Sequence, residues 1–333
     1  MHFITIFIEM KFRTLLLPAL LLLSLAACKK EDEELEYMEG SFKIEHSMPK
    51  YVNAGEKYTF SVSGIKAPDG TAVGYYFTPP ITKIADTTSV YNYTVPDTLG
   101  TFSLTITAYP VESSDKYYSS PTTVSFTIVS DSGSLSGLPR SMDGGSATLY
   151  SRRYSTMKYG DSEWICSNLC YLDDSVGHPY SDCKAMQNIV GGYYTWEEAQ
   201  GVCPEGWHLP SDAEWVEMLK HCGAPESLQP LEDSPSGAGN LMVRAYFNGV
   251  SMWQYYRNVS ITASSFFHAI PAGYADILSG IYDFKGFCSY AAFWTSSEDE
   301  GSGVYRYINQ AYDNVYVARA DKDTFAASVR CVR

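Results

Sequence analysis

The residues best suited to chemistry lie in a corner of the sequence, Cys-Pro-Glu-Gly-Trp-His-Leu-Pro at residues 203–210. His208 in this corner could act as a general acid or base, a role in which a histidine needs a partner that orients its ring. The carboxylates nearest to it in sequence, Asp212 and Glu214, open the next helix and are expected to serve its N-terminal cap. We therefore expect His208 to make a structural hydrogen bond.

Motifs that would mark an enzyme are absent from the sequence. Neither Gly-x-Ser-x-Gly nor His-Glu-x-x-His occurs, and acidic pairs such as Asp173-Asp174 lack a partner. Zinc binding is the alternative for the Cys-x-x-x-Cys spacing of Cys166 and Cys170, but no second Cys/His pair follows at the spacing of a zinc finger. We therefore expect no catalytic residue, no metal site and no cofactor.

The cysteines fit an exported protein with disulfide bonds. Eight occur in the chain, and the seven that follow Cys28 all lie in its second half. In an oxidising compartment such cysteines pair, and an odd number leaves at least one free thiol. The seven are Cys166, Cys170, Cys183, Cys203, Cys222, Cys288 and Cys331.

An aromatic cluster, Met-Trp-Gln-Tyr-Tyr-Arg-Asn at residues 252–258, is the best candidate for a ligand-binding site. Aromatic side chains interrupted by polar ones suit stacking against sugar rings or contact with a protein surface. A buried strand is the alternative interpretation, and the sequence leaves both open. The ligand-binding candidates are Trp253, Tyr255, Tyr256 and Arg257.

Composition and charge narrow the range of partners. The chain has 333 residues and a formal net charge of −14, and no Lys/Arg cluster interrupts the acidity. Such a length is typical of about two domains. Since phosphate binding relies mainly on basic residues, we expect no nucleic acid as a partner. Tyrosine is unusually frequent, with 27 residues, which favours β structure and exposed aromatic surface.

The N-terminus has the features of a secretion signal. Lys11 and Arg13 precede an apolar run at 15–25 that is too short to span a bilayer. The Leu-Ala-Ala-Cys that ends at Cys28 resembles a bacterial lipobox. This resemblance implies that residues 1–27 are a lipoprotein signal peptide. It also implies that Cys28 carries diacylglycerol and palmitate and binds the lipid of the outer membrane.

An acidic run, Lys-Lys-Glu-Asp-Glu-Glu-Leu-Glu, follows Cys28 within residues 28–40. It resembles the surface-export signal of Bacteroidetes lipoproteins, which implies an outer-membrane lipoprotein exposed at the cell surface. A solvated, disordered tether is the bland alternative, and both interpretations can hold together. Residues 1–9 are expected to precede the true start at Met10, because the basic region is complete from that residue.

Short alternating runs across residues 41–130 predict an all-β Ig-like sandwich. About seven short strands separated by turn residues fit this stretch, which contains no cysteine. The run at 100–110 resembles Ig-like and PKD-like domains, which implies a spacer that lifts a working domain off a surface. Ligand binding by this region is the alternative. A Gly/Ser-rich stretch, 131–147, is expected to be a linker to a second domain at 148–333.

Two helix starts are well specified in the second domain. Thr195 with Glu198, and Ser211 with Glu214, each fit a capping box, in which a hydroxyl and a carboxylate satisfy free backbone N–H groups. The corner at 203–210 is therefore bracketed by the ends of two helices. Segments so well defined locally are usually built for packing, which favours a structural joint over a chemical site.

Four segments of the second domain are similar, in the same order, to the Fibrobacter succinogenes major paralogous domain family. The resemblance covers nearly all of residues 148–333. It implies an α+β C-type-lectin-like fold, related to formylglycine-generating enzymes, in which two helices pack on small antiparallel sheets. The motifs that carry it are Trp-Ile-Cys-Ser-Asn-Leu (164–169), Cys-Pro-Glu-Gly-Trp-His-Leu-Pro (203–210), Phe-Trp-Thr-Ser-Ser (293–297) and Val-Arg-Cys-Val-Arg (329–333).

The family resemblance also implies disulfide pairings. In C-type-lectin-like folds a Cys after the helical region is bonded to a Cys in the last strand, and Cys203 and Cys331 occupy those places. This bond closes a loop of about 128 residues, which in the chain-entropy model contributes roughly 4–5 kcal/mol. The other hypothesised pairs are Cys183 with Cys170 or Cys166, where the family often has a local bridge, and Cys222 with Cys288.

Three functions stand as hypotheses. The expected one is a non-catalytic surface lipoprotein that recognises an extracellular glycan or protein through its lectin-like domain. A structural or adhesive component of a cell-surface assembly is the alternative, and it needs no pocket. A formylglycine-generating-type enzyme is a second alternative, but it needs a reactive Cys pair near the C-terminal end, where only Cys331 stands. The calcium-dependent sugar motifs of C-type lectins are absent, so sugar binding by that route is not expected.

Overall fold

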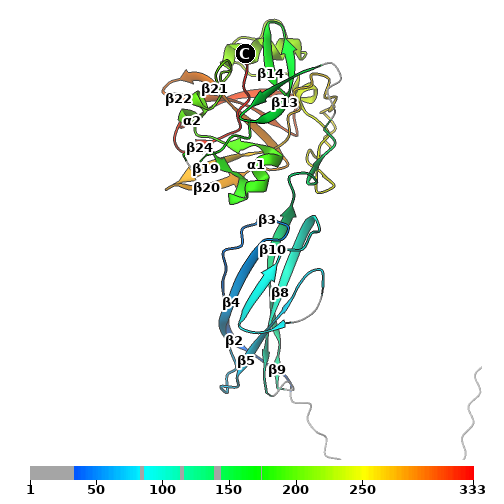
Figure 1. Ribbon diagram of the computed structural model, residues 1–333, viewed down its shortest axis with the longest axis vertical. Helices are drawn as coiled ribbons and strands as arrows, with labels where there is room; N and C mark the ends of the chain where they lie inside the picture. The colour runs from blue at the N-terminus through cyan, green and yellow to red at the C-terminus, as the bar shows by residue number, and fades with distance from the viewer. Residues whose placement is uncertain (1–33, 83–85, 113–115, 139–143, 174) are drawn as a thin grey trace, which may run out of the picture.

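The computed structural model describes residues 34–82, 86–112, 116–138, 144–173 and 175–333. The expected signal peptide, residues 1–27, and Cys28 lie outside the described residues. Figure 1 shows two bodies stacked end to end, one made of the strands up to β10 (Ser120–Val129) and the other of the helices and later strands. None of the helices in the described ranges is both long and apolar enough to cross a membrane.

The N-terminal body consists of two main sheets. One has the strand order β3-β10-β8-β5-β6, with β3 at Tyr51–Asn53, β8 at Gly100–Pro110, β5 at Val73–Thr78 and β6 at Asp86–Thr87. The other has the order β2-β4-β7, with bounds Glu39–Glu45, Lys57–Lys66 and Val90–Thr94. A short parallel pair joins β1 (Glu36–Tyr37) to β9 (Tyr117–Tyr118).

Alternation along these strands places apolar side chains between the two sheets. Phe60 and Val62 of β4 are buried, whereas Ser63 beside them is exposed, as the two-residue period of a strand requires. They share one core with Leu104 of β8 and Phe126 of β10, which belong to the opposite sheet. The described part of residues 41–130 is therefore all-β, as predicted.

The C-terminal body is a set of small sheets. The three-stranded sheets have the orders β12-β13-β14, β21-β22-β23, β20-β19-β24 and β11-β17-β18, and β15 pairs with β16. The strands are β11 (Leu135–Ser136), β12 (Gly145–Leu149), β13 (Arg152–Tyr159), β14 (Ser162–Ile165), β15 (His178–Pro179), β16 (Gly192–Tyr193), β17 (Tyr246–Phe247), β18 (Val250–Ser251), β19 (Tyr274–Leu278), β20 (Ile281–Lys285), β21 (Tyr290–Asp299), β22 (Ser302–Asn309), β23 (Val315–Ala320) and β24 (Phe325–Ala326).

Four short α-helices accompany these sheets in the described residues: α1 (Lys184–Val190), α2 (Trp196–Gly201), α3 (Asp212–His221) and α4 (Ala238–Leu241). Helices α2 and α3 begin where the sequence predicts, and each has a complete capping box, at Thr195 and at Ser211. Helices α1 and α4 were not expected. Neither has a side-chain cap, so the local signal that identifies the other two is missing from both.

Residues 131–147 differ from the flexible linker that their Gly/Ser content predicts. In the described part of this stretch, Leu135–Ser136 forms β11, which pairs with β17 of the C-terminal body. Gly145 begins β12, which pairs with β13. The backbone of these residues is thus used in sheets, which composition alone does not reveal.

An aromatic contact joins the two bodies. Tyr51 of β3 is 5% exposed, and its ring lies edge-on against Tyr180, Phe247 and Phe287 of the C-terminal body, with centroid distances of 5.4, 6.1 and 6.1 Å. Asn248 adds a hydrogen bond from its side-chain amide to the backbone oxygen of Ile128, at 2.9 Å. The two bodies therefore share a packed interface.

Candidate functional site

The corner at 203–210 fastens the end of α2 to the C-terminal segment. Cys203 and Cys331 form a disulfide bond with 5.8 Å between their Cα atoms, so the predicted bridge is present. The backbone N–H of His208 donates to Val332 at 2.8 Å, and the N–H of Val332 donates back at 2.9 Å. Covalent and backbone bonds thus act together at this joint.

The side chain of His208 is tied to the cap of α3. Its Nε2 atom lies 2.7 Å from Oε1 of Glu214. The other carboxylate oxygen of Glu214 accepts from the backbone and hydroxyl of Ser211 at 2.7 and 2.8 Å. Because Glu214 serves the histidine and the cap together, this arrangement agrees with the structural role expected for His208.

The other hypothesised disulfides are absent, because five of the described cysteines are free thiols. Cys222 packs in the core around α3, whereas Cys288 lies against the core around α1, so the pairing of these two is wrong. Cys183 belongs to the α1 core. Cys166 and Cys170 line a cavity instead of bonding to Cys183.

An ion pair is fully buried under α3. Arg306 of β22 donates through Nε to Oδ1 of Asp212 at 2.5 Å and through Nη2 to Oδ2 at 2.7 Å. The side chains of Arg306 and Asp212 are 0% and 1% exposed. The backbone N–H of Leu231 also donates to Asp212, at 2.7 Å. A carboxylate whose oxygens are so fully engaged holds the fold and is not free for catalysis.

The predicted aromatic cluster lines a cavity of about 510 Å³. Trp253 forms a buried part of its wall: the side chain is 3% exposed, and its Nε1 donates to the backbone oxygen of Ala269 at 3.0 Å. Tyr255 is 88% exposed, Tyr256 is half-buried and Arg257 is exposed. The cluster therefore combines both interpretations, because Trp253 belongs to the core while the residues after it form a surface.

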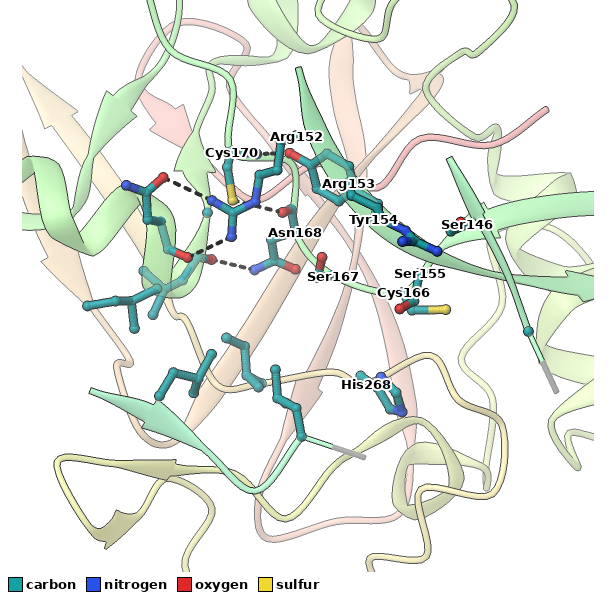
Figure 2. A pocket seen from close by; sticks show the side chains of 18 of the residues that line it. Ser146, Arg152, Arg153, Tyr154, Ser155, Cys166, Ser167, Asn168, Cys170 and His268 are labelled. Carbon is teal, nitrogen blue, oxygen red and sulfur yellow. Dashed lines mark hydrogen bonds between the residues drawn. The ribbon is translucent and has the colours of Figure 1, made fainter. Parts of the chain in front are cut away.

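A larger cavity, of about 750 Å³, was not predicted from the sequence (Figure 2). Arg152 of β13 donates to the side-chain and backbone oxygens of Asn188, each at 2.9 Å. The hydroxyl of Tyr154 accepts from the backbone N–H of Cys170 at 3.0 Å. The walls come from segments far apart in the sequence, between residues 135 and 270, so no local motif could have indicated this cavity.

Two neutral groups in the larger cavity limit its chemistry. The side chain of His268 is buried, and its Nε2 has no hydrogen-bond partner in the described part of the chain. Burial, and then the positive charge of Arg330, lower the pKa of His268 to about 4. Burial also raises the pKa of Cys166 to about 11. At neutral pH the imidazole is therefore uncharged and the thiol is protonated, which suits reversible binding better than nucleophilic attack.

Metal-ligating side chains do not gather in the described residues: no group of three or more His, Cys, Asp or Glu is arranged to hold an ion. Cys166 and Cys170, the pair considered for zinc, line the larger cavity together with arginine, asparagine and serine side chains.

A comparison with known protein families matches residues 157–333 to the Fibrobacter succinogenes major domain. The match covers more than half of the chain and contains the corner, the buried ion pair and the whole aromatic cavity. It confirms the resemblance drawn from the four sequence segments. No curated protein matches the chain.

Proposed function

The chain belongs to the Fibrobacter succinogenes major domain family, and on this premise we propose that it is a non-catalytic outer-membrane lipoprotein that recognises an extracellular ligand. The ligand is a glycan or a protein, bound by the family domain. The observation that carries the proposal is the 510 Å³ cavity lined by the aromatic cluster. Its volume lies within the range of ordinary ligand pockets.

The side chains at the mouth of this cavity suit recognition of a sugar or a peptide. Tyr255 offers an exposed ring, and its neighbour Tyr256 has one side packed against the core. Arg244 and Arg257 also line the cavity and supply hydrogen-bond donors. A ring flanked by donors matches the apolar face and polar edge of a sugar.

The N-terminal body is proposed to be an Ig-like spacer, and the family domain to be C-type-lectin-like. Cys28 stands eight residues before β1, since 36 − 28 = 8. Strand β1 pairs with β9, which lies at the end of the N-terminal body remote from the family domain (Figure 1). A lipid on Cys28 would thus place the membrane at the end of the molecule opposite to the family domain, which carries the cavity.

The first experiment measures binding of the full-length chain to a panel of plant and host glycans, followed by titration of any that bind. Tyr255→Ala is expected to weaken binding roughly tenfold or more, as truncation of an aromatic contact at the centre of an interface usually does. Tyr37→Ala is the matched control, because Tyr37 is also exposed, at 76%, but lies in the N-terminal body. Trp253→Ala is avoided because that residue belongs to the core.

The outcome of this experiment decides between classes of ligand. Loss of binding in Tyr255→Ala and not in Tyr37→Ala would support the glycan-binding function. If Tyr255→Ala binds every glycan as tightly as the wild type does, the aromatic cavity is not the binding site. Absence of any glycan binding, together with capture of an envelope protein that depends on Tyr255, would favour the adhesive alternative.

Anchoring is tested separately in cells. Metabolic labelling with a fatty-acid analogue is expected to label the wild-type chain and not Cys28→Ala. Protease treatment of intact cells is expected to remove the family domain if the protein is exposed at the surface. A labelled Cys28→Ala variant would show that Cys28 is not the lipidation site.

A further inference from the structure

The larger cavity lies beside a buried positive charge that has no counter-ion among the described residues. Arg330 is fully buried, and its guanidinium donates only to neutral oxygens, namely Asn168 Oδ1 at 2.9 Å and three backbone carbonyls. Arg306, the other fully buried arginine, has the carboxylate of Asp212. A buried charge without a counter-ion is costly, so its retention beside a cavity calls for an explanation.

Arg330 also holds the loop that forms one wall of the cavity. It donates to the backbone oxygen of Phe267 at 2.7 Å and to that of His268 at 3.3 Å. The φ angle is +59° at Phe266, in a region that residues with bulky side chains rarely adopt, and +53° at His268, a residue type that adopts it more often. Such strain persists only where the surroundings enforce it. Here it presents the unpartnered imidazole of His268 to the cavity.

The charged residues that line the cavity itself, Arg152 and Arg153, are positive. Arg152 uses two of its N–H groups on Asn188, and Arg153 has no ion-pair partner among the described residues. Neither Asp nor Glu lines the cavity as described. Asp131 is bound to the other end of the Asn188 amide, at 2.7 Å, and lies outside the lining. Glu163, whose charge acts on Cys166, also lies outside the lining and is paired with Arg333. In a chain of net charge −14, the charged side chains that line the described cavity are thus positive.

We propose that the larger cavity binds a small molecule through a carboxylate group, held by the guanidinium of Arg153 and by the Nε2–H of His268. The carboxylate would satisfy the orphan imidazole and supply the negative charge that Arg330 lacks. The aromatic cavity shares no lining residue with this site, so the proposal does not depend on the function assigned there.

A carboxylate fits better than a phosphate because few donors are left free in the cavity. The planar guanidinium fork of an arginine forms bidentate pairs with carboxylates and phosphates alike. His268 is held neutral by burial and by Arg330, which lower its pKa to about 4, so it donates a hydrogen bond without adding charge. Arg152 and Arg330 already donate to oxygens of the protein. Arg153 and His268 are left to pair with the two oxygens of a carboxylate, and they are too few for the three oxygens of a phosphate.

The size of the cavity sets the size of the ligand. A volume of about 750 Å³ accommodates a disaccharide or a dipeptide with room for water. Uronic acids and peptide C-termini both present a carboxylate. The hydroxyls of Ser146, Ser155 and Ser167 line the cavity and can pair with the remaining polar groups of either.

The test is isothermal titration of the full-length chain with two acidic probes and their neutral counterparts. The probes are digalacturonic acid against its methyl ester, and an N-acetylated dipeptide against its C-terminal amide. At least one acid is expected to bind while its neutral counterpart does not. The acid that binds more tightly identifies whether the carboxylate comes from a sugar or from a peptide. Arg153→Gln is expected to weaken that binding roughly 10–100-fold, the usual effect of losing a charged hydrogen bond.

Two further variants guard against misfolding as an explanation. Arg257→Gln removes the same charge from the aromatic cavity and should leave binding of the acid unchanged. His268→Asn keeps a residue type that tolerates positive φ while removing the ring donor. It should weaken binding of the acid as Arg153→Gln does. In the wild type, the ¹⁵N NMR signal of His268 Nε2 should shift when the acid binds.

Clear results would overturn the proposal. These are failure of both acids to bind, equal binding of acid and neutral counterpart, tighter binding of inorganic phosphate, or unchanged binding in Arg153→Gln. Loss of acid binding in Tyr255→Ala and not in Arg153→Gln would place the ligand in the aromatic cavity. That result would reject this inference while leaving the proposed recognition function intact.

Discussion

The N-terminal body and the family domain are stabilised in different ways. Apart from Thr107 and Thr127, the side chains counted as buried in the described N-terminal body are hydrophobic. The family domain buries Asp212, Arg306 and Arg330. Apolar cores tolerate substitution gradually if volume is kept, whereas a buried charge network fails when one member is removed. The two bodies should therefore respond differently to single changes.

Short strands in part of the family domain account for some of this difference, although β21 there has 10 residues. Strand β8 has 11 residues and β4 has 10, so long ladders satisfy the backbone of the N-terminal body. In the family domain β15 and β16 have two residues each, and side chains replace the missing ladder bonds. Asn168 donates to the backbone oxygen of Val190 at 2.8 Å, and Arg330 donates to three backbone oxygens. Such side chains cannot be replaced by apolar ones without leaving carbonyls unpaired.

Breaking the buried ion pair should have the largest effect. Asp212→Ala leaves the guanidinium of Arg306 buried without a counter-ion, which should lower the free energy of unfolding by about 3–5 kcal/mol. All six tryptophans lie in the family domain, so denaturation followed by tryptophan fluorescence reports that body alone.

Asp161→Asn is the control for this change, because Asp161 is exposed at the turn between β13 and β14. The double variant Asp212→Ala with Arg306→Met should recover part of the loss, since an apolar pair often replaces a buried ion pair without penalty. An Asp212→Ala variant as stable as the wild type would show that the pair contributes nothing, and the contrast between the two bodies would fail.

Removing the disulfide should have the next largest effect, again confined to the family domain. The Cys203–Cys331 bond spans 128 residues of sequence. The double variant Cys203→Ser with Cys331→Ser should lose about 2–5 kcal/mol. Cys288→Ser is the control, since Cys288 is a free thiol. The unfolding midpoint of this variant, followed by tryptophan fluorescence, should change far less. If reductant leaves the wild-type midpoint unchanged, the bond does not stabilise the domain.

Truncating Tyr51 should separate the two bodies. Its ring is the part of β3 that packs on Tyr180, Phe247 and Phe287, and loss of a central aromatic anchor typically weakens an interface by about 2 kcal/mol or more. In Tyr51→Ala the transition seen by tryptophan fluorescence should move away from that seen by far-UV circular dichroism. Tyr37→Ala should leave the two in their wild-type relation, because Tyr37 is 76% exposed. Identical shifts of the two unfolding transitions in both variants would mean that the interface does not couple the unfolding of the two bodies.

The features that could be predicted from the sequence are those decided by neighbouring residues. Both capping boxes are local, since each joins a hydroxyl to a carboxylate three residues later. The burial of Phe60 and Val62 in β4 follows from alternation. The Cys203–Cys331 bond was anticipated through the family resemblance, because no local pattern links residues so far apart.

The features that the sequence missed depend on distant segments. Trp253 lies in a run without periodicity, and only the folded structure, in which the ring packs in the core and donates to Ala269, shows that it is buried. Arg330 looks like a surface residue in the sequence, but it is fully buried against the rings of Phe267 and Phe293. The larger cavity is bounded by segments that tertiary folding brings together, so no spacing of residues could announce it.

Removing one cap should have the smallest effect and should depend on pH. Ser211→Ala should cost about 1 kcal/mol, the usual value of an N-cap. Burial acts to raise the pKa of Glu214, but hydrogen bonds from Ser211 and His208 outweigh it and lower that pKa below 4.5. A carboxyl whose folded pKa is lowered contributes stability that is present above its unfolded pKa and lost as the pH falls through its folded pKa. Wild-type stability in tryptophan fluorescence should therefore fall below about pH 4.5, and the loss should be smaller in Ser211→Ala, where one of those bonds is missing.

Ser227→Ala, at an exposed position, should keep the wild-type pH profile. Equal pH profiles in all three proteins would mean that the Ser211 hydroxyl does not shift the pKa of Glu214, and the cap would then add to the family domain only what any local helix start adds.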